Sequence, residues 1–253
     1  MSAPQTTWTL RAVPELASTN ETMLEQAVLG AADNSWLRAD RQTAGRGRRG
    51  RVWESPAGNL LLSGLIRARP GEGMLAQLSF VAALAVREAL GQWVPAGRLL
   101  LKWPNDVLLD GAKVSGILLE TRATPRELPW VVVGIGINLA HHPVGLERPA
   151  TSLQAMTGDA PDPDTVARAV ITTFDAWRRR WREGGFAPIR TAWLASASGL
   201  GARIEARLTY RTLAGQFLDL AEDGALVLRL DSGVVETLHA ADVFEGTGHA
   251  AGD

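Results

Sequence analysis

The residues best suited to chemistry form a short basic segment, residues 45–51, with the sequence Gly-Arg-Gly-Arg-Arg-Gly-Arg. Arginine presents a rigid fork of N–H donors that can hold a carboxylate or a phosphate through two hydrogen bonds. The interleaved glycines let the backbone approach a ligand closely and leave its N–H groups accessible. The segment, called the arginine loop below, therefore predicts a site for a ligand with two anionic groups.

An alternative interpretation is a basic surface loop that contacts nucleic acid or has no ligand at all. Two flanking residues favour the anion site over this alternative. Gln42 can both donate to and accept from a neutral polar ring, and Trp53 can stack on a flat base, although alone it would more often be a core residue. The like charges of an empty loop repel one another, and no apolar residue holds them in place. We therefore expect the loop to be mobile without ligand and to order on an anion.

A second polar set, Lys-Trp-Pro-Asn-Asp at residues 102–106, follows an apolar segment. Lys102, Asn105 and Asp106 combine a cation, an amide and a carboxylate at a strand end, which suits phosphate oxygens and a hydrated Mg²⁺ ion. An Asn-Asp pair alone would usually be only a turn. Lys113 follows at hairpin distance in an apolar strand, where a lysine usually faces solvent. If it faces the cavity instead, it can neutralise a carboxylate that attacks an α-phosphate.

A third feature is the glycine-spaced segment Gly-Ile-Gly-Ile-Asn at residues 134–138. It lacks the third glycine and the helix of a dinucleotide-binding fingerprint, and no Walker A sequence occurs in the chain. Two interpretations stay open: the glycines let a ligand approach, with Asn138 at a phosphate or ribose, or they only ease packing. The histidines and carboxylates show no metal-site spacing, and no Gly-x-Ser-x-Gly sequence indicates an α/β-hydrolase.

The elements that must position these residues follow helix and strand patterns in irregular order. Apolar spacing and capping residues predict a helix from Ser18 to Gly30 and further helices at residues 74–90, 163–181 and 186–193. Strands are predicted at residues 35–39, 59–66, 99–103, 107–109, 113–120 and 130–138, with a hairpin turn at Asp110-Gly111. The polar start before Ser18 receives no element. Strands joined by hairpins, with helices between only some of them, indicate an α+β domain.

From Gly201 onward the pattern changes to short alternating segments separated by turn residues, which is typical of a small β-barrel. We therefore expect a first domain over residues 1–198, a second over residues 199–246, and a flexible tail at residues 247–253.

Composition excludes several classes of protein. The formal net charge of -1 gives no global basic field for nucleic acid or an anionic membrane. The absence of cysteine excludes disulfides, thiolate metal sites and a cysteine nucleophile. The chain start lacks a signal-peptide pattern and no apolar run reaches bilayer length, so we expect a cytoplasmic protein with no membrane association.

Taken together, the motifs resemble those of biotin protein ligases, in the same order along the chain. The resemblance rests on Ser18-Thr19-Asn20, Gln42 and residues 45–53, 102–106, 113–118 and 134–138. It implies a class II synthetase-like, mixed-sheet α+β catalytic domain followed by an SH3-like β-barrel.

The resemblance also implies a reaction in two halves, with ATP and Mg²⁺ as cofactors. The biotin carboxylate would attack the α-phosphorus of Mg-ATP to give biotinoyl-5′-AMP and pyrophosphate. The ε-amine of a carrier-protein lysine would then attack this mixed anhydride. The implied partner is the biotin carboxyl carrier protein or domain of acetyl-CoA carboxylase.

Site residues follow from the same resemblance. Biotin would be bound by Ser18, Thr19, Asn20, Gln42, Arg46, Gly47, Arg48, Lys113 and Gly116. ATP would be bound by Arg48, Arg49, Arg51, Trp53, Lys102, Asn105, Asp106 and Asn138. Lys113 and Arg48 would be the catalytic residues, and Asp106 would contact Mg²⁺.

Other functions stay open at this point. A lipoate or octanoate ligase would bind an apolar tail, for which the polar residues Ser18 and Gln42 are poorly suited. A ligand-sensing regulator would not need Lys113 beside phosphate-binding groups, and an RNA-binding protein would show salt-dependent binding that biotin does not affect. Because only 17 residues precede Ser18, too few for a helix-turn-helix unit, we expect no specific DNA binding or repressor activity. A homodimer is one hypothesis for the assembly of the protein.

Overall fold

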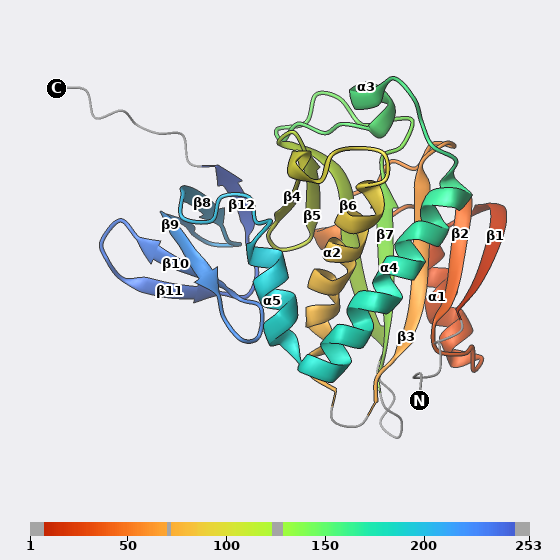
Figure 1. Ribbon diagram of the computed structural model, residues 1–253, viewed down its shortest axis with the longest axis horizontal. Helices are drawn as coiled ribbons and strands as arrows, with labels where there is room; N and C mark the ends of the chain where they lie inside the picture. Colours follow the sequence, from red (N-terminus) through yellow and green to blue (C-terminus); the bar gives the residue numbers. More distant parts are fainter. Residues whose placement is uncertain (1–7, 70–71, 123–128, 246–253) are drawn as a thin grey trace.

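The computed structural model describes residues 8–69, 72–122 and 129–245. The predicted tail at residues 247–253 lies outside these ranges. Within them, the fold is α+β, as predicted: helices pack on a large mixed sheet, and a small antiparallel sheet follows (Figure 1).

The described part of the large sheet has seven strands in the order β1-β2-β3-β7-β6-β5-β4. Strands β1 and β2 pair in parallel, and every other neighbouring pair is antiparallel. The strands are β1 (Thr9–Leu16), β2 (Ser35–Gln42), β3 (Leu60–Arg67), β4 (Leu99–Lys102), β5 (Asp106–Leu109), β6 (Ala112–Arg122) and β7 (Trp130–Ile137).

Strand β1 corrects the sequence prediction, which left the residues before Ser18 without an element. It is an edge strand with only partial burial, so it lacks the strict apolar alternation that marks a half-buried strand. Its pairing with β2 ends with Leu16 opposite Gln42, and the carbonyl of Leu16 accepts from Thr43 N at 3.0 Å. The missed strand therefore fixes where the segment leading to the arginine loop leaves the sheet.

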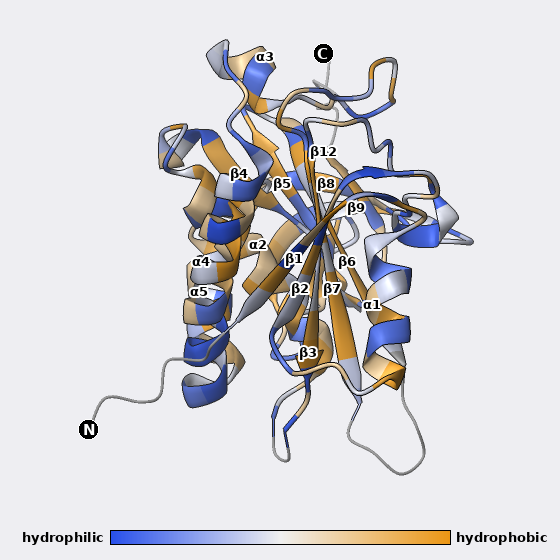
Figure 2. Ribbon diagram, turned by 90° about the vertical axis from the view of Figure 1, so that its right-hand side faces the viewer, coloured by the Kyte–Doolittle hydropathy of each residue, from blue (hydrophilic) through white to orange (hydrophobic). Residues whose placement is uncertain are grey.

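Helices cover both faces of the sheet, which Figure 2 shows nearly edge-on. Helix α1 (Thr19–Val28) lies on one face, where Met23 and Ala27 pack in a cluster with residues of β3 and β7. The other face carries α2 (Leu78–Leu90), α4 (Pro163–Gly184) and α5 (Phe186–Leu194), and a short α3 (Leu153–Thr157) lies beyond the ends of the strands, at the top of Figure 1. The predicted helices are present, although α2 begins at Leu78 after a 3₁₀ turn. Among the described residues, no helix is both long and apolar enough to cross a bilayer.

The small sheet confirms the predicted second β unit, with the strand order β11-β10-β9-β8-β12 and antiparallel pairing. Its strands are β8 (Arg203–Arg207), β9 (Thr212–Leu220), β10 (Leu226–Leu230), β11 (Val235–Leu238) and β12 (Asp242–Glu245).

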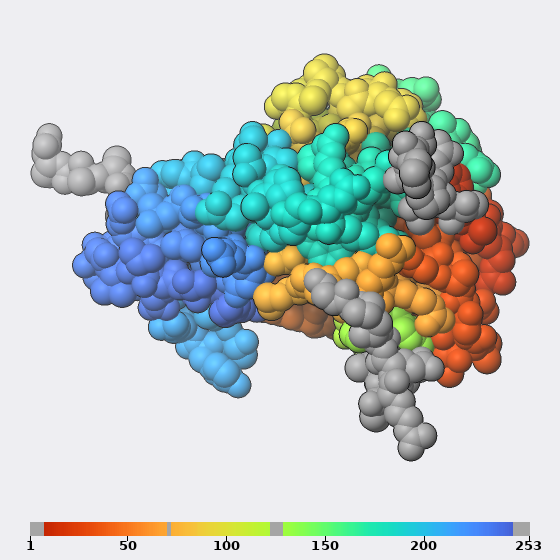
Figure 3. All heavy atoms as spheres, turned by 60° about the horizontal axis from the view of Figure 1, so that its bottom comes forward, coloured from red at the N-terminus to blue at the C-terminus, as the bar shows by residue number. Residues whose placement is uncertain are grey.

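The two sheets share one hydrophobic core. Phe217 and Leu226 of the small sheet belong to the same buried cluster as Phe80 and Trp193 of the helical layer. Trp103 Nε1 also donates to the carbonyl of Gly224 at 3.0 Å. Figure 3 shows the small sheet in blue against the cyan helix that precedes it. This packing holds the C-terminal strand β12 in place beside the first domain.

Candidate active site

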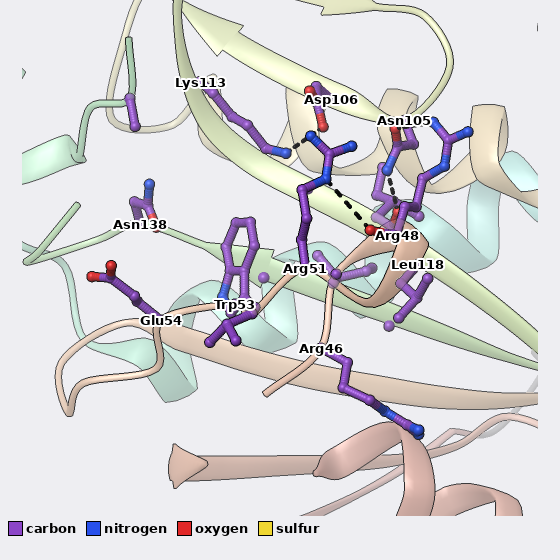
Figure 4. A pocket seen from close by; sticks show the side chains of 18 of the residues that line it. Arg46, Arg48, Arg51, Trp53, Glu54, Asn105, Asp106, Lys113, Leu118 and Asn138 are labelled. Atoms are coloured by element: carbon purple, nitrogen blue, oxygen red, sulfur yellow. Dashed lines mark hydrogen bonds and ion pairs between the residues drawn. The ribbon is translucent and has the colours of Figure 1, made fainter. Parts of the chain in front are cut away.

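A cavity of about 390 Å³ lies where β3, β6 and β7, the arginine loop and β12 meet (Figure 4). Most of the predicted site residues line it, although they come from distant parts of the chain. They are Ser18, Thr19, Asn20, Gln42, Arg46, Gly47, Arg48, Arg51, Trp53, Asn105, Asp106, Lys113, Gly116 and Asn138. Two predicted residues, Arg49 and Lys102, are not among the lining residues.

One part of the cavity is lined by neutral hydrogen-bonding groups. Gln42 Oε1 accepts from the backbone N–H and the hydroxyl of Thr19, at 2.7 and 2.9 Å. Ser63 Oγ lies 2.7 Å from Thr19 Oγ1 and 2.6 Å from Asn20 Oδ1. Asn20 Nδ2 donates to Glu120 Oε2 at 2.7 Å. These bonds fix the side chains before a ligand binds and leave an amide and hydroxyls for a neutral polar group.

The glycines of β7 make room for side chains of this pocket. A Cβ on Gly134 would lie 2.3 Å from Asn20 Oδ1, and a Cβ on Gly136 would lie 2.4 Å from Trp53 Cε2. Gly116 of β6 leaves similar space, because its Cβ would lie 3.0 Å from Trp53 Cζ3. The close packing that one of the two interpretations predicted is present, and the packed side chains, Asn20 and Trp53, themselves line the pocket.

Lys113 faces the pocket instead of solvent. The β5–β6 hairpin turns through Asp110 and Gly111, both at positive φ, and returns Lys113 towards Asp106. The Lys113 ammonium lies 2.6 Å from Asp106 Oδ1 and 5.4 Å from the centre of the Trp53 ring. Asp106 is only 7% exposed, whereas the Lys113 side chain is 30% exposed, so the carboxylate of this ion pair is shielded from water and the ammonium group is partly open to the cavity. A substrate carboxylate or phosphate that replaced Asp106 would find a preformed ammonium group.

Counter-charges for the arginine loop come from the protein itself, whereas the sequence argument considered only the repulsion among the like charges of the empty loop. Asp242 of β12 binds Arg49 at 3.1 Å and Arg51 at 3.0 Å. Arg48 donates to Asn105 Oδ1 at 3.0 Å. Figure 4 shows Arg46 apart from this group, and it lies 3.4 Å from Glu120.

Burial distinguishes Arg48 from the other loop arginines. Burial lowers the pKa of the Arg48 guanidinium, and the nearby carboxylates of Asp242 and Asp106 only partly oppose this effect. A desolvated cation attracts an anion more strongly than a hydrated one, because less water screens the interaction. Arg48 is therefore the loop cation that would gain most from a bound phosphate.

The remaining predicted residues have specific structural contacts. Asn138 is buried, and its amide donates to the carbonyl of Thr151 at 3.0 Å, which holds residues 149–151 beside the pocket. The Lys102 ammonium lies 5.9 Å from the centre of the Phe244 ring. Both residues thus support the pocket wall in this structure.

Sequence reasoning missed several residues of the site. Ser63 and Glu120 belong to the polar network, whereas Arg148, Asp242 and Phe244 line the cationic side of the cavity. These residues stand outside the motifs, and Asp242 and Phe244 lie in the second domain. Only the packing of the two domains brings Asp242 and Phe244 to the site.

Within the described residues, no group of three or more His, Asp or Glu side chains could hold a metal ion. Asp106 is the carboxylate that pairs with Lys113, and its Oδ1 contacts the ammonium group as an ion pair without hydrogen-bond geometry. A single carboxylate is compatible with Mg²⁺ that is held mainly by phosphates and water.

Comparison with known proteins identifies the family to which this fold belongs. The model of the "Biotin/lipoate A/B protein ligase family" matches residues 13–138, and the model of the "Biotin protein ligase C terminal domain" matches residues 199–246. These two domains in this order define a ligase of the biotin type.

Individual relatives narrow the class. The biotin–[acetyl-CoA-carboxylase] ligase of Paracoccus denitrificans is 45% identical, over 91% of this chain and 99% of that protein. The bifunctional ligase/repressor BirA of Bacillus subtilis is 35% identical, over 91% of this chain and 72% of that protein. The solved biotin protein ligase of Aquifex aeolicus, in complex with biotin and ATP, superposes with a TM-score of 0.81 at 30% identity, covering 94% and 99% of the two chains. The chain therefore belongs to the biotin protein ligase family.

Proposed function

We propose that the chain is an ATP-dependent ligase that makes biotinoyl-5′-AMP and then transfers biotin to a lysine of a biotin carboxyl carrier protein of acetyl-CoA carboxylase. The observation that carries the proposal is the Lys113–Asp106 pair, with its buried carboxylate, which shares one cavity with the uncharged polar side chains of Thr19 and Gln42 and with the arginine loop. Two comparisons support the proposal: the biotin–[acetyl-CoA-carboxylase] ligase of Paracoccus denitrificans, and the Aquifex aeolicus biotin protein ligase in complex with biotin and ATP.

The neutral part of the pocket suits the ureido ring of biotin, which both donates and accepts hydrogen bonds. Gln42 and Thr19 hold each other in place, and Ser18 caps α1 beside them. A buried site built to bond polar groups disfavours a ligand that lacks them, because its own donors and acceptors would stay unpaired. This network therefore favours biotin over lipoate, whose corresponding tail is apolar.

The cationic part suits the first half-reaction. An oxygen of the biotin carboxylate attacks the α-phosphorus, a new O–P bond forms, and the bond to the β-phosphate oxygen breaks to release pyrophosphate. Lys113 exchanges Asp106 for the reacting carboxylate and α-phosphate, and Arg48 and Arg51 hold the phosphates. Trp53, already seated on Gly136, provides a flat surface for the adenine.

Asp106 is the residue that would hold Mg²⁺, together with the phosphates of ATP. When bound, the ion neutralises phosphate charge and polarises the phosphorus–oxygen bonds. Asn105 lies next to Asp106, where its side chain already bonds Arg48 and the carbonyl of Ile117, so it orients the loop around this site.

In the second half-reaction, the neutral ε-amine of the carrier lysine attacks the acyl carbon of biotinoyl-5′-AMP. An amide bond forms, the acyl–phosphate bond breaks, AMP leaves and the ammonium proton passes to solvent. The reaction needs no covalent enzyme intermediate. The proposal also places the protein in the cytoplasm, where ATP and the carrier of acetyl-CoA carboxylase are available.

The test is incubation of the protein with biotin, ATP, Mg²⁺ and an apo carrier domain, followed by mass spectrometry of the carrier. We expect a mass increase of one biotinoyl group that requires both ATP and Mg²⁺. A parallel incubation with lipoate identifies the alternative, since labelling by lipoate alone would contradict the proposal.

A further inference from the structure

Phe244 of β12 is the aromatic side chain that the second domain contributes to the cavity wall. Two guanidinium groups lie against it: the Cζ of Arg148 is 3.9 Å from the ring centre, and that of Arg207 is 3.8 Å from it. Such short separations are typical of cation–π stacking, which fixes both the ring and the guanidinium plane.

The charges of these two arginines are balanced in different ways. Arg207 forms ion pairs with Glu147 and Glu205, each at 2.6 Å. Arg148 lines the cavity, and its Nη2 atom is buried without a hydrogen-bond partner among the described residues. A buried charged donor without an acceptor is costly, and such groups commonly mark the place of a ligand or ion.

The surroundings of Arg148 agree with this view. Burial is the main cause that lowers the pKa of its guanidinium, and Asp242 and Asp106 only partly oppose it. Arg51 acts on Arg148 as a nearby like charge. Arg148 and Arg51 therefore belong to one cationic region, in which an anionic ligand would relieve both desolvation and repulsion.

The backbone places Arg148 close to the reacting groups. Lys113 N donates to the carbonyl of Pro149 at 2.9 Å, and Thr151 N donates to the carbonyl of Lys113 at 2.9 Å. Ala150 and Lys113 form a parallel bridge, so residues 149–151 run beside the start of β6. Arg148 thus precedes a segment that is attached directly to the lysine of the proposed reaction.

We propose that Arg148 binds the β- and γ-phosphates of ATP, and hence the pyrophosphate leaving group, and that Phe244 positions it. The inference rests on the proposed function, which places the α-phosphate at Lys113. The next anionic groups of ATP are its β- and γ-phosphates, and Arg148 offers a fork of donors that suits them. The second domain thereby takes part in the first half-reaction through Phe244.

The decisive experiment compares the binding of ATP and pyrophosphate, which carry the β- and γ-phosphates, with that of AMP and biotinoyl-5′-AMP, which lack them. Arg148→Met keeps the length of the side chain but removes its charge and its fork. We expect it to raise the KM for ATP and the Kd for inorganic pyrophosphate about 10- to 100-fold, the range for one lost charge-assisted hydrogen-bonding group. The Kd for AMP and the rate of carrier labelling from preformed biotinoyl-5′-AMP should change less than about threefold, because neither ligand carries a β-phosphate.

Arg207→Met is the matched control. Arg207 also stacks on the Phe244 ring, but it is not among the residues that line the cavity. The variant should leave pyrophosphate binding within about threefold of that of the wild-type protein. Arg148→Lys, which keeps the charge, should recover part of the affinity for pyrophosphate and carries the test if Arg148→Met does not fold. Phe244→Leu should weaken pyrophosphate binding less than Arg148→Met does.

Two results would overturn the inference. One is pyrophosphate affinity in Arg148→Met and Arg148→Lys equal to that of the wild-type protein. The other is an equal loss of labelling from ATP and from preformed biotinoyl-5′-AMP, which would indicate a purely structural role. Failure of the wild-type protein to label a carrier from biotin and ATP would instead contradict the proposed function itself.

Discussion

Arg51 Nη2 lies 3.0 Å from Asp242 Oδ1, so an ion pair connects the arginine loop to the last strand of the second domain. Arg49 binds the other carboxylate oxygen of Asp242 at 3.1 Å. Burial acts to raise the pKa of Asp242, but Arg51, Arg148 and Arg49 outweigh it and hold this pKa below its ordinary value. The carboxylate thus occupies Arg51, one of the arginines that the proposed function assigns to phosphate.

Asp242→Asn should therefore loosen the ligand-free loop. Loss of two partly exposed ion pairs is expected to speed amide hydrogen exchange in residues 46–51 about 3- to 10-fold, as judged by the usual strength of such pairs. Exchange would be followed by mass spectrometry. Asp231→Asn, which removes the exposed pair with Arg203 in the same domain, is the control and should leave the loop unchanged. Equal exchange in Asp242→Asn and the wild-type protein would refute this role of Asp242.

Lys113→Ala should slow the formation of biotinoyl-5′-AMP about 100-fold or more in single-turnover experiments. The variant removes a preorganised cation from the site where negative charge must be stabilised. It also leaves Asp106 without its ion-pair partner, and Lys113→Ala combined with Asp106→Asn measures the destabilisation from that unpaired carboxylate, although it removes the proposed Mg²⁺ contact as well. The double variant should recover stability but not rate. Recovery of the adenylation rate would show that Lys113 merely neutralises Asp106.

Gly136→Ala should disturb Trp53 more than it disturbs the rest of the fold. The new methyl group would lie 2.4 Å from Trp53 Cε2, which forces the indole away from the sheet. We expect a KM for ATP at least about tenfold higher and a destabilisation of about 1–3 kcal/mol from overpacking. The KM and the urea midpoint would be measured beside those of Gly97→Ala. Gly97 has open space around its Cβ position, so its variant should resemble the wild-type protein in both measurements.

Asp33→Asn should destabilise the first domain at neutral pH by about 3 kcal/mol, since it leaves the Arg178 cation buried without its carboxylate. Arg178 Nη2 binds both Asp33 oxygens, at 2.8 and 3.0 Å, and its side chain is 1% exposed. Urea unfolding would measure the free energy difference between the two proteins.

The pH dependence of this difference provides a second check. Burial acts to raise the pKa of Asp33, but Arg178 and its other partners hold it below the ordinary value of 3.8. A carboxyl group whose pKa is lower in the folded protein stabilises the fold above its unfolded pKa. The difference between Asp33→Asn and the wild-type protein should therefore be complete above about pH 5 and shrink as the pH falls below 4. A difference that grows on acidification would contradict the assignment.

Much of the local structure follows from the sequence alone. Ser18 predicts the start of α1 because its hydroxyl can accept from the N–H of Glu21 within the same turn. Asp110-Gly111 predicts the β5–β6 hairpin because such a turn needs residues that tolerate positive φ. The classes of ligand also follow from the sequence. Arginines beside glycines suit carboxylates and phosphates, and Gln42 suits a neutral polar ring, whatever the topology of the fold. These features depend on residues that are close together in the chain.

Tertiary structure decided which of these groups meet and which charges they meet. Strand β1 was not predictable from apolar alternation because a mostly exposed edge strand need not alternate. Lys113 could have faced solvent, and only the hairpin register turns it towards Asp106. Asp242 and Phe244 reach the pocket because the second domain shares a core with the first. Burial and electrostatic pairing depend on neighbours in space. The sequence alone therefore determines which reactive and charged groups the protein has, whereas the packed fold determines where each charge lies and what it pairs with.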